Sequence, residues 1–187
     1  MPHRAFIGIG SNLGDRAAHL REATQRLSGL PATRLTRQSS IYETEPVGEV
    51  SGPFLNSVVE IETDLAADAL LRRLLAIERT MGRKRAAGRK RASARDRSYR
   101  PRVIDLDLLF FDNEVIDQPR LQVPHPRLHE RRFVLAPMAE LAPALIHPQR
   151  NASISELLAR LKSPEHVTLA RAELLRPRLS KQQVVSR

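Results

Sequence analysis

The sequence predicts an α+β fold, and three observations lead to it. Strand-like apolar runs alternate with two segments that show the 3.6-residue period of amphipathic helices. These elements follow one another in the order strand, helix, strand, strand, helix, strand. The length of 187 residues suits one domain with a full hydrophobic core. This order is typical of the split βαβ, or ferredoxin-like, arrangement, in which helices cover one face of a mainly antiparallel sheet and leave the other free to form a site.

The first strand is expected over residues 5–10, which lead into a glycine-containing turn. A dinucleotide-binding fingerprint would need glycine at position 13, where Leu13 stands, so we reject a Rossmann fold here. Asp15 is the expected N-cap of a helix over residues 16–28, which ends at Gly29.

A second strand is expected over residues 33–42 and a third over residues 54–63, with a loop rich in proline and glycine between them. Asn56 is the polar residue near an apolar run in the third strand. Either it bonds to the backbone at the end of a strand, or it reads the edge of a heterocycle, with Phe54 stacking nearby. The pattern leaves both interpretations open.

The second helix is expected over residues 65–81, before Gly82. Glu78 falls at the edge of its apolar stripe. This glutamate is either a surface residue whose stem packs on the core or a partner for the basic segment that starts one turn later.

The fourth strand is expected within residues 100–111 and carries two aspartates, Asp105 and Asp107. Because side chains alternate along a strand, the two carboxylates share one face, roughly 6–7 Å apart at the backbone. We expect Val103, Leu109 and Phe111 on that face, and Ile104, Leu106, Leu108 and Phe110 on the other. Two carboxylates at this spacing can bind one or two hard cations such as Mg²⁺, or can lie on a solvated face paired with arginines.

The positive charge of the chain is concentrated beside this strand. Residues 83–102 hold ten lysines and arginines and one acidic residue, so nearly all of the net charge of +10 lies there. Such a local field suits a polyphosphate ligand, and a nucleic-acid binder could also use it. Residues 84–100 are expected to be mobile until a polyphosphate and a second ligand are both bound, when Arg83 and Arg102 would close onto the phosphates.

The chain after the fourth strand is expected to add further strands and helices. A short strand is predicted near residues 114–116, and residues 121–126 form an extended segment that presents His125 between two prolines. A capping-box pattern starts a helix over residues 153–161.

Composition limits the class of protein. The absence of cysteine excludes disulfides, zinc-thiolate sites and cysteine nucleophiles. There is no signal-peptide pattern and no apolar run of membrane length, so we expect a cytoplasmic monomer with no membrane partner. We expect one domain over residues 1–162 and a partly disordered extension over residues 163–187, in which residues 165–176 could be helix or strand.

Several segments over roughly residues 4–160 form one pattern. They are Gly8-Ile-Gly-Ser-Asn-Leu-Gly-Asp15, Ser40-Ile-Tyr-Glu-Thr-Glu-Pro-Val-Gly48, Pro53-Phe-Leu-Asn56, Arg100-Pro-Arg-Val-Ile-Asp-Leu-Asp-Leu-Leu109 and Val123-Pro-His-Pro126 with Arg131-Arg-Phe133. Together they resemble one family, the 6-hydroxymethyl-7,8-dihydropterin pyrophosphokinases of folate biosynthesis. The resemblance implies a ferredoxin-like fold and an enzyme that transfers the terminal pyrophosphate of ATP to the hydroxymethyl group of the reduced pterin, releasing AMP.

The resemblance also implies roles for individual residues. Asp105 and Asp107 would bind two Mg²⁺ ions and, with Arg83 and Arg102, form the catalytic set. The ATP-binding residues would be Glu78, Arg83, Arg85, Arg102, Leu108, Arg120, Gln122, His125 and Arg131. The pterin pocket would consist of Thr44, Val47, Phe54, Asn56 and Phe133, with the two phenylalanine rings sandwiching the heterocycle.

The sequence departs from the family pattern at three places. Tyr99 and Arg100 stand where the family usually has Trp-Gly, Leu75 stands where it often has glutamine, and the basic segment between Arg85 and Tyr99 is longer. A nucleic-acid-binding domain is disfavoured, because two tyrosines and five phenylalanines offer no aromatic-rich stacking strand. A different metal-dependent nucleotidyl transferase is the remaining alternative, and it would release pyrophosphate rather than AMP.

Overall fold

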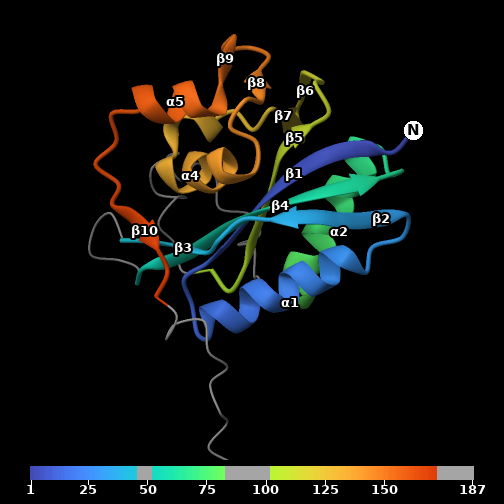
Figure 1. Cartoon of the computed structure of the whole chain (residues 1–187). Coiled ribbons are helices and arrows are strands. Elements are labelled where there is room, and N and C mark those ends of the chain that lie inside the picture. The colour runs from blue at the N-terminus through green and yellow to red at the C-terminus, as the bar shows by residue number, and fades with distance from the viewer. Residues whose placement is uncertain (46–51, 83–101, 172–187) are drawn as a thin grey trace, which may run out of the picture.

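The computed structural model describes residues 1–45, 52–82 and 102–171 (Figure 1). A six-stranded sheet has the order β10–β3–β4–β1–β5, with β2 also paired to β4, and every pairing is antiparallel. Its strands are β1 (His3–Ser11), β2 (Thr33–Gln38), β3 (Tyr42–Thr44), β4 (Phe54–Thr63), β5 (Asp105–Phe111) and β10 (Val167–Leu169). The helices in the described ranges are α1 (Arg16–Ser28), α2 (Ala67–Thr80), α4 (Arg132–Leu141), α5 (Ile154–Arg160) and the 3₁₀ turn η1 (Leu128–Glu130).

Helices α1 and α2 pack on one face of the sheet and enclose the larger core (Figure 1). The predicted bounds of α1 are confirmed, because the Asp15 side chain accepts the N–H of Ala18 and Gly29 ends the helix. The α2 helix begins two residues later than expected and ends one residue earlier. Leu70 and Leu74 of α2 are fully buried in this core.

Helices α4 and α5 pack on the opposite face and enclose a second core (Figure 1). Phe6 and Phe110 of the sheet lie there with Leu135 and Met138 of α4. The expectation that this face is free is therefore wrong over these strand positions. Among the described residues, the candidate site lies at the end of this face that contains Gly10. The polar residues Asn56 and Asp105 lie beside Gly10 there.

The single strand expected over residues 33–42 is also wrong, since the chain forms two strands there. Ser39 lies between β2 and β3, where its main-chain N–H donates to Val58 O at 2.9 Å and its Oγ accepts the N–H of Val58 at 3.0 Å. A polar side chain thus takes over the role of a ladder partner and divides the strand. Both β2 and β3 still pair with β4.

A bulge in β5 changes which side chains share a face. In the β1–β5 ladder Ile7 lies opposite Leu108 and Phe6 opposite Phe110, so Leu109 is an extra residue. Phe110 therefore lies in the α4 core and Phe111 in the α1–α2 core, the reverse of the prediction for both rings. The strand also begins at Asp105, so residues 102–104 are not part of it.

Two small hairpins and the C-terminal strand complete the described fold. The hairpins are β6 (Ile116–Gln118) with β7 (Leu121–Val123), and β8 (Ile146–His147) with β9 (Ala152–Ser153). The predicted capping box of α5 is confirmed by Ser153 and Glu156. Of the two possibilities for the C-terminal extension, residues 167–169 form a strand, and the tail expected to be disordered lies outside the described residues. We find no helix in the described ranges that combines the length and apolar character needed to cross a membrane.

Candidate active site

A glycine in the central strand forms the floor of the site. Gly10 of β1 lies opposite Asn56 of β4 on one side and Asp105 of β5 on the other. A Cβ on Gly10 would lie 3.1 Å from Asn56 Oδ1 and 4.0 Å from the ring of Phe54. Since side chains of paired residues point to the same face, the missing side chain leaves space between an amide and a carboxylate. Gly10 belongs to the first predicted strand and to the segment Gly8–Asp15, but neither pattern indicated this role.

The two aspartates of β5 face arginines. Arg102 Nη1 forms an ion pair with Asp105 Oδ2, and Arg131 Nη1 lies 3.6 Å from Asp107 Oδ2. Burial and the charge of Asp105 raise the pKa of Asp107 to about 7, against the opposing effect of Arg131 and Arg102. Each aspartate thus pairs with an arginine, as the solvated-face interpretation expects, and 37% of the Asp107 side chain is exposed. A carboxylate pair that resists ionisation is also suited to a bound cation, so this geometry fits both interpretations.

The end of β1 holds the main chain that precedes the aspartates. Asn12 Oδ1 accepts the N–H of Arg102 at 2.6 Å, and the N–H of Asn12 donates to Arg102 O at 3.1 Å. Ser11 Oγ donates to Val103 O at 2.6 Å. These contacts place Arg102 beside Asp105. The sequence signal for Ser11 and Asn12 was their position in the turn after the first strand, which carried no indication of their distant partners.

Glu78 is a buried support for β5. Its side chain is fully buried, and Oε1 accepts the main-chain N–H of Leu106 at 2.8 Å. The surface interpretation of Glu78 is therefore wrong. Its other predicted partner, the basic segment, lies outside the described residues, as do the predicted phosphate ligands Arg83 and Arg85.

His125 lies against the same strand. Its main-chain N–H donates to Leu109 O at 2.9 Å. Burial and the neighbouring Arg131 lower the pKa of His125 to about 4, so its imidazole is neutral at physiological pH. Its Nδ1 accepts the main-chain N–H of Arg127 at 3.2 Å, so the neutral ring carries its proton on Nε2 and offers a ligand a donor rather than a charge.

Three of the predicted pterin residues lie together on β3 and β4 beside Gly10. Asn56 Nδ2 donates to Thr44 Oγ1 at 2.9 Å, and Thr44 lies opposite Phe54 in the β3–β4 ladder. Phe133 is the second residue of α4, and the guanidinium carbon of Arg131 lies 5.6 Å from its ring centroid. Val47 lies outside the described residues.

The remaining predicted nucleotide residues lie in or near the β6–β7 hairpin, or in the core. Arg120 is exposed in the turn, and Gln122 on β7 donates its Nε2 to Asp117 Oδ1 at 2.8 Å. The Leu108 side chain is buried in the α1–α2 core, so only its main chain could contact a ligand. No hydrogen bond or ion pair in the described ranges joins the side chains of Arg120 and Gln122 to the aspartate pair, whereas Leu108 directly follows Asp107 in β5.

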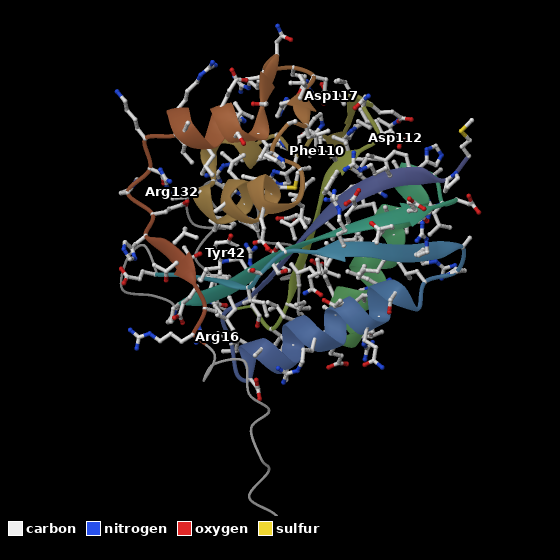
Figure 2. The ribbon with its side chains drawn as sticks, viewed as in Figure 1. Arg16, Tyr42, Phe110, Asp112, Asp117 and Arg132 are labelled. Carbon is white, nitrogen blue, oxygen red and sulfur yellow. The ribbon has the colours of Figure 1, made fainter. Side chains whose placement is uncertain are left out.

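Two further side-chain hydrogen-bond groups, which no local sequence pattern predicted, involve Arg16 and Tyr42 (Figure 2). Arg16, at the start of α1, donates from Nη1 to Glu43 Oε1 at 2.9 Å and to Pro53 O at 2.7 Å. Glu140 of α4 accepts the hydroxyl of Tyr42 at 3.0 Å. These residues immobilise β3 and the start of β4, and their pairing depends on contacts that no local pattern reveals.

The geometry of the site indicates a class of protein. Two carboxylates flanked by arginines are typical of proteins that bind a polyphosphate through divalent cations. The Asn56 amide on the other side of Gly10 adds a polar group that could contact a planar ligand. The fold and site together indicate an enzyme of phosphoryl-group transfer.

Comparison with known proteins specifies the family. The family model described as 7,8-dihydro-6-hydroxymethylpterin-pyrophosphokinase (HPPK) matches residues 6–143. The chain belongs to this family. It is 45% identical over 142 residues to a 2-amino-4-hydroxy-6-hydroxymethyldihydropteridine pyrophosphokinase of Bacillus subtilis, covering 75% of this chain and 79% of the relative. A protein of the same name from Methylorubrum extorquens is 39% identical over 159 residues, covering 84% of this chain and 93% of the relative.

A solved structure shows the same fold at low identity. The wild-type HPPK-DHPS of Plasmodium falciparum with pteroate superposes with a TM-score of 0.65 at 14% identity. The match covers 86% of this chain but only 44% of that longer chain. The mixed α/β fold of this protein is therefore the one found in HPPK-containing enzymes.

Proposed function

We propose that this protein transfers the pyrophosphate of ATP to the hydroxymethyl group of 6-hydroxymethyl-7,8-dihydropterin, giving AMP and the pterin diphosphate for folate biosynthesis. Family membership supports the reaction. The observation that carries the proposal is the position of Asn56 and Asp105 on opposite sides of Gly10. An acceptor held at the amide and a phosphate held at the carboxylates would meet over the central strand.

The donor set fits magnesium. Asp105 and Asp107 would hold two Mg²⁺ ions, because hard cations prefer carboxylate oxygens and a cation removes the repulsion that raises the pKa of Asp107. When bound, Mg²⁺ supplies charge neutralisation for the triphosphate. Arg102 and Arg131 now pair with these carboxylates. Once the cations take over the carboxylates, both guanidinium groups can turn to the phosphates.

The described pocket residues suit a pterin. Asn56 Nδ2 is engaged by Thr44, so Oδ1 faces the space over Gly10 as an acceptor. The amide edge of a pterin carries N–H donors that match an acceptor there. Phe54 and Phe133 supply the two rings for stacking on the heterocycle. His125 and the nucleotide residues Glu78, Leu108, Arg120 and Gln122 complete the proposed ATP side, with Glu78 acting through β5.

Arginines and fixed amides account for the transfer without a covalent protein intermediate. Phosphoryl-group transfer depends mainly on positioning and on neutralising charge that develops between the attacking and leaving oxygens. The ion pairs of Arg102 and Arg131 place both side chains beside the aspartates before any ligand binds.

We also infer that the core is ferredoxin-like. The order β3–β4–β1–β5 with α1 and α2 on one face supports this assignment. Residues 1–162 are proposed as the catalytic domain and residues 163–187 as an extension. A monomer in the cytoplasm stays a prediction.

One incubation tests the proposed function. The protein is mixed with Mg-ATP and 6-hydroxymethyl-7,8-dihydropterin, and the products are separated by chromatography. We expect AMP and pterin diphosphate in equal amounts, and neither product from Asp107→Ala. Release of pyrophosphate instead of AMP would indicate a nucleotidyl transferase. A salt-sensitive shift of nucleic acid without turnover would indicate a binding domain.

A further inference from the structure

The start of α4 lacks a cap of its own. Arg131 occupies the N-cap position and makes no side-chain capping hydrogen bond. Glu165, 33 residues further along the chain, supplies the acceptor, because its Oε2 accepts the N–H of Arg132 at 2.8 Å. A carboxylate at this end of a helix stabilises it through the hydrogen bond and through the helix dipole. In return, Arg132 Nη2 donates to Leu161 O at 2.9 Å (Figure 2).

The same segment then joins the edge of the sheet. His166 O accepts the N–H of Glu45 at 3.2 Å, and Val167 of β10 lies opposite Thr44 of β3. Figure 1 shows the chain running from α5 past α4 to β10 beside β3. Residues 161–170 are therefore bonded both to the first residue of α4 and to β3.

These two attachment points lie next to residues proposed for pterin binding. Arg132 lies between Arg131, which faces Asp107, and Phe133. Thr44 holds the amide of Asn56. No contact of Glu165 reaches the aspartates or Asn56 directly, so its influence on a ligand would pass through the main chain of α4 and β3.

We propose that Glu165 is a positioning residue for the pterin substrate, which fixes Phe133 and Arg131 relative to Thr44 through the cap on α4 and the adjoining strand β10. The inference rests on the proposed function and extends it to a C-terminal segment beyond the residues that the family model matches. It assigns to this segment a role in binding, in addition to its role in covering the sheet edge.

The test separates affinity from stability. Glu165→Ala removes the acceptor, and Glu165→Gln keeps one. As a matched control, Glu156→Ala removes the carboxylate that accepts the N–H of Ser153 at the start of α5 and leaves the Ser153 N-cap in place. Pterin affinity is measured by calorimetry with Mg²⁺ and a saturating non-hydrolysable ATP analogue, and thermal unfolding is followed in parallel. We expect Glu165→Ala to weaken pterin binding about fivefold, Glu165→Gln to recover most of that loss, and both alanine variants to lose similar stability.

Three outcomes would be decisive. Pterin binding within twofold of wild type in Glu165→Ala would overturn the positioning role. An equal loss of affinity in Glu156→Ala would show that general destabilisation is responsible, and would overturn it too. If the wild-type protein does not bind the pterin at all, the proposed function itself fails. If the wild type binds normally and Glu165→Ala binds equally well, only the role of Glu165 fails.

Discussion

Asn56 lies opposite Gly10 in the β1–β4 ladder, and its Oδ1 would be only 3.1 Å from a Cβ placed on that glycine. Cβ atoms seldom tolerate such an approach, so the amide and the glycine depend on each other. The same glycine lies opposite Asp105 on its other side. One residue without a side chain thus separates the amide proposed to bind the pterin from the proposed metal ligands.

Gly10→Ala should displace the Asn56 amide and weaken pterin binding about tenfold, because the new methyl group lies against Oδ1. Gly8→Ala is the matched control, since its Cβ would meet only the Leu109 side chain at an ordinary 3.5 Å. Calorimetry with the pterin and, separately, with Mg-ATP measures both variants. Equal effects of the two substitutions would argue against a specific role for the space over Gly10.

Asn56→Ala should damage pterin binding much more than ATP binding. Removing a buried amide leaves the ligand's polar groups without partners, at roughly 1–3 kcal/mol. Thr44→Val removes the hydroxyl that accepts from Asn56 Nδ2 and should give a smaller loss in the same direction. The two ligands are titrated separately, and a parallel loss of both would identify Asn56 as a structural residue.

Asp105→Ala and Asp107→Ala should each lower turnover at saturating Mg²⁺ by at least about a hundredfold, because metal ions supply several kcal/mol of charge stabilisation. Circular dichroism should show a folded protein in both cases. A near-normal rate in either variant would remove that residue from the proposed metal site.

Without Mg²⁺, the free energy of unfolding should fall as pH rises from about 4 to about 7. The pKa of Asp107 is raised in the native state, so the folded protein retains a proton that the unfolded chain releases, and this contribution is lost as pH rises through about 7. Urea unfolding of wild type and Asp107→Asn across this range isolates the effect, and the wild type should lose stability relative to the variant as pH rises, because the amide cannot ionise. Saturating Mg²⁺ should stabilise the wild type more at pH 8 than at pH 5, because protons compete with the cation.

Arg102→Ala should lower kcat by about a hundredfold while changing the affinity for ATP much less, since a charge contact made chiefly in the reacting state acts on the rate. Steady-state and single-turnover kinetics separate the two effects. Asn12→Ala, which removes the acceptor for Arg102 N–H, should shift the rate in the same direction but less. A change confined to ATP affinity would make Arg102 a simple binding residue.

Local chemistry determined the elements that the sequence predicted well. Asp15 and Gly29 mark the two ends of α1, because capping involves residues within one turn. The Ser153–Glu156 capping box starts α5 for the same reason. Strand alternation correctly placed Asp105 and Asp107 on one face, because the bulge at Leu109 comes after them.

Contacts between distant parts of the chain decided the rest. Asn12 meets Arg102, Glu78 meets Leu106, and Glu165 caps α4, each across many residues and without a local signal. The Leu109 bulge reversed the faces of Phe110 and Phe111 because β1 sets the register of β5. The sequence alone therefore determined the residue types needed for the chemistry, and tertiary structure determined their positions, since hydrogen-bond partners and strand register depend on which segments meet in space.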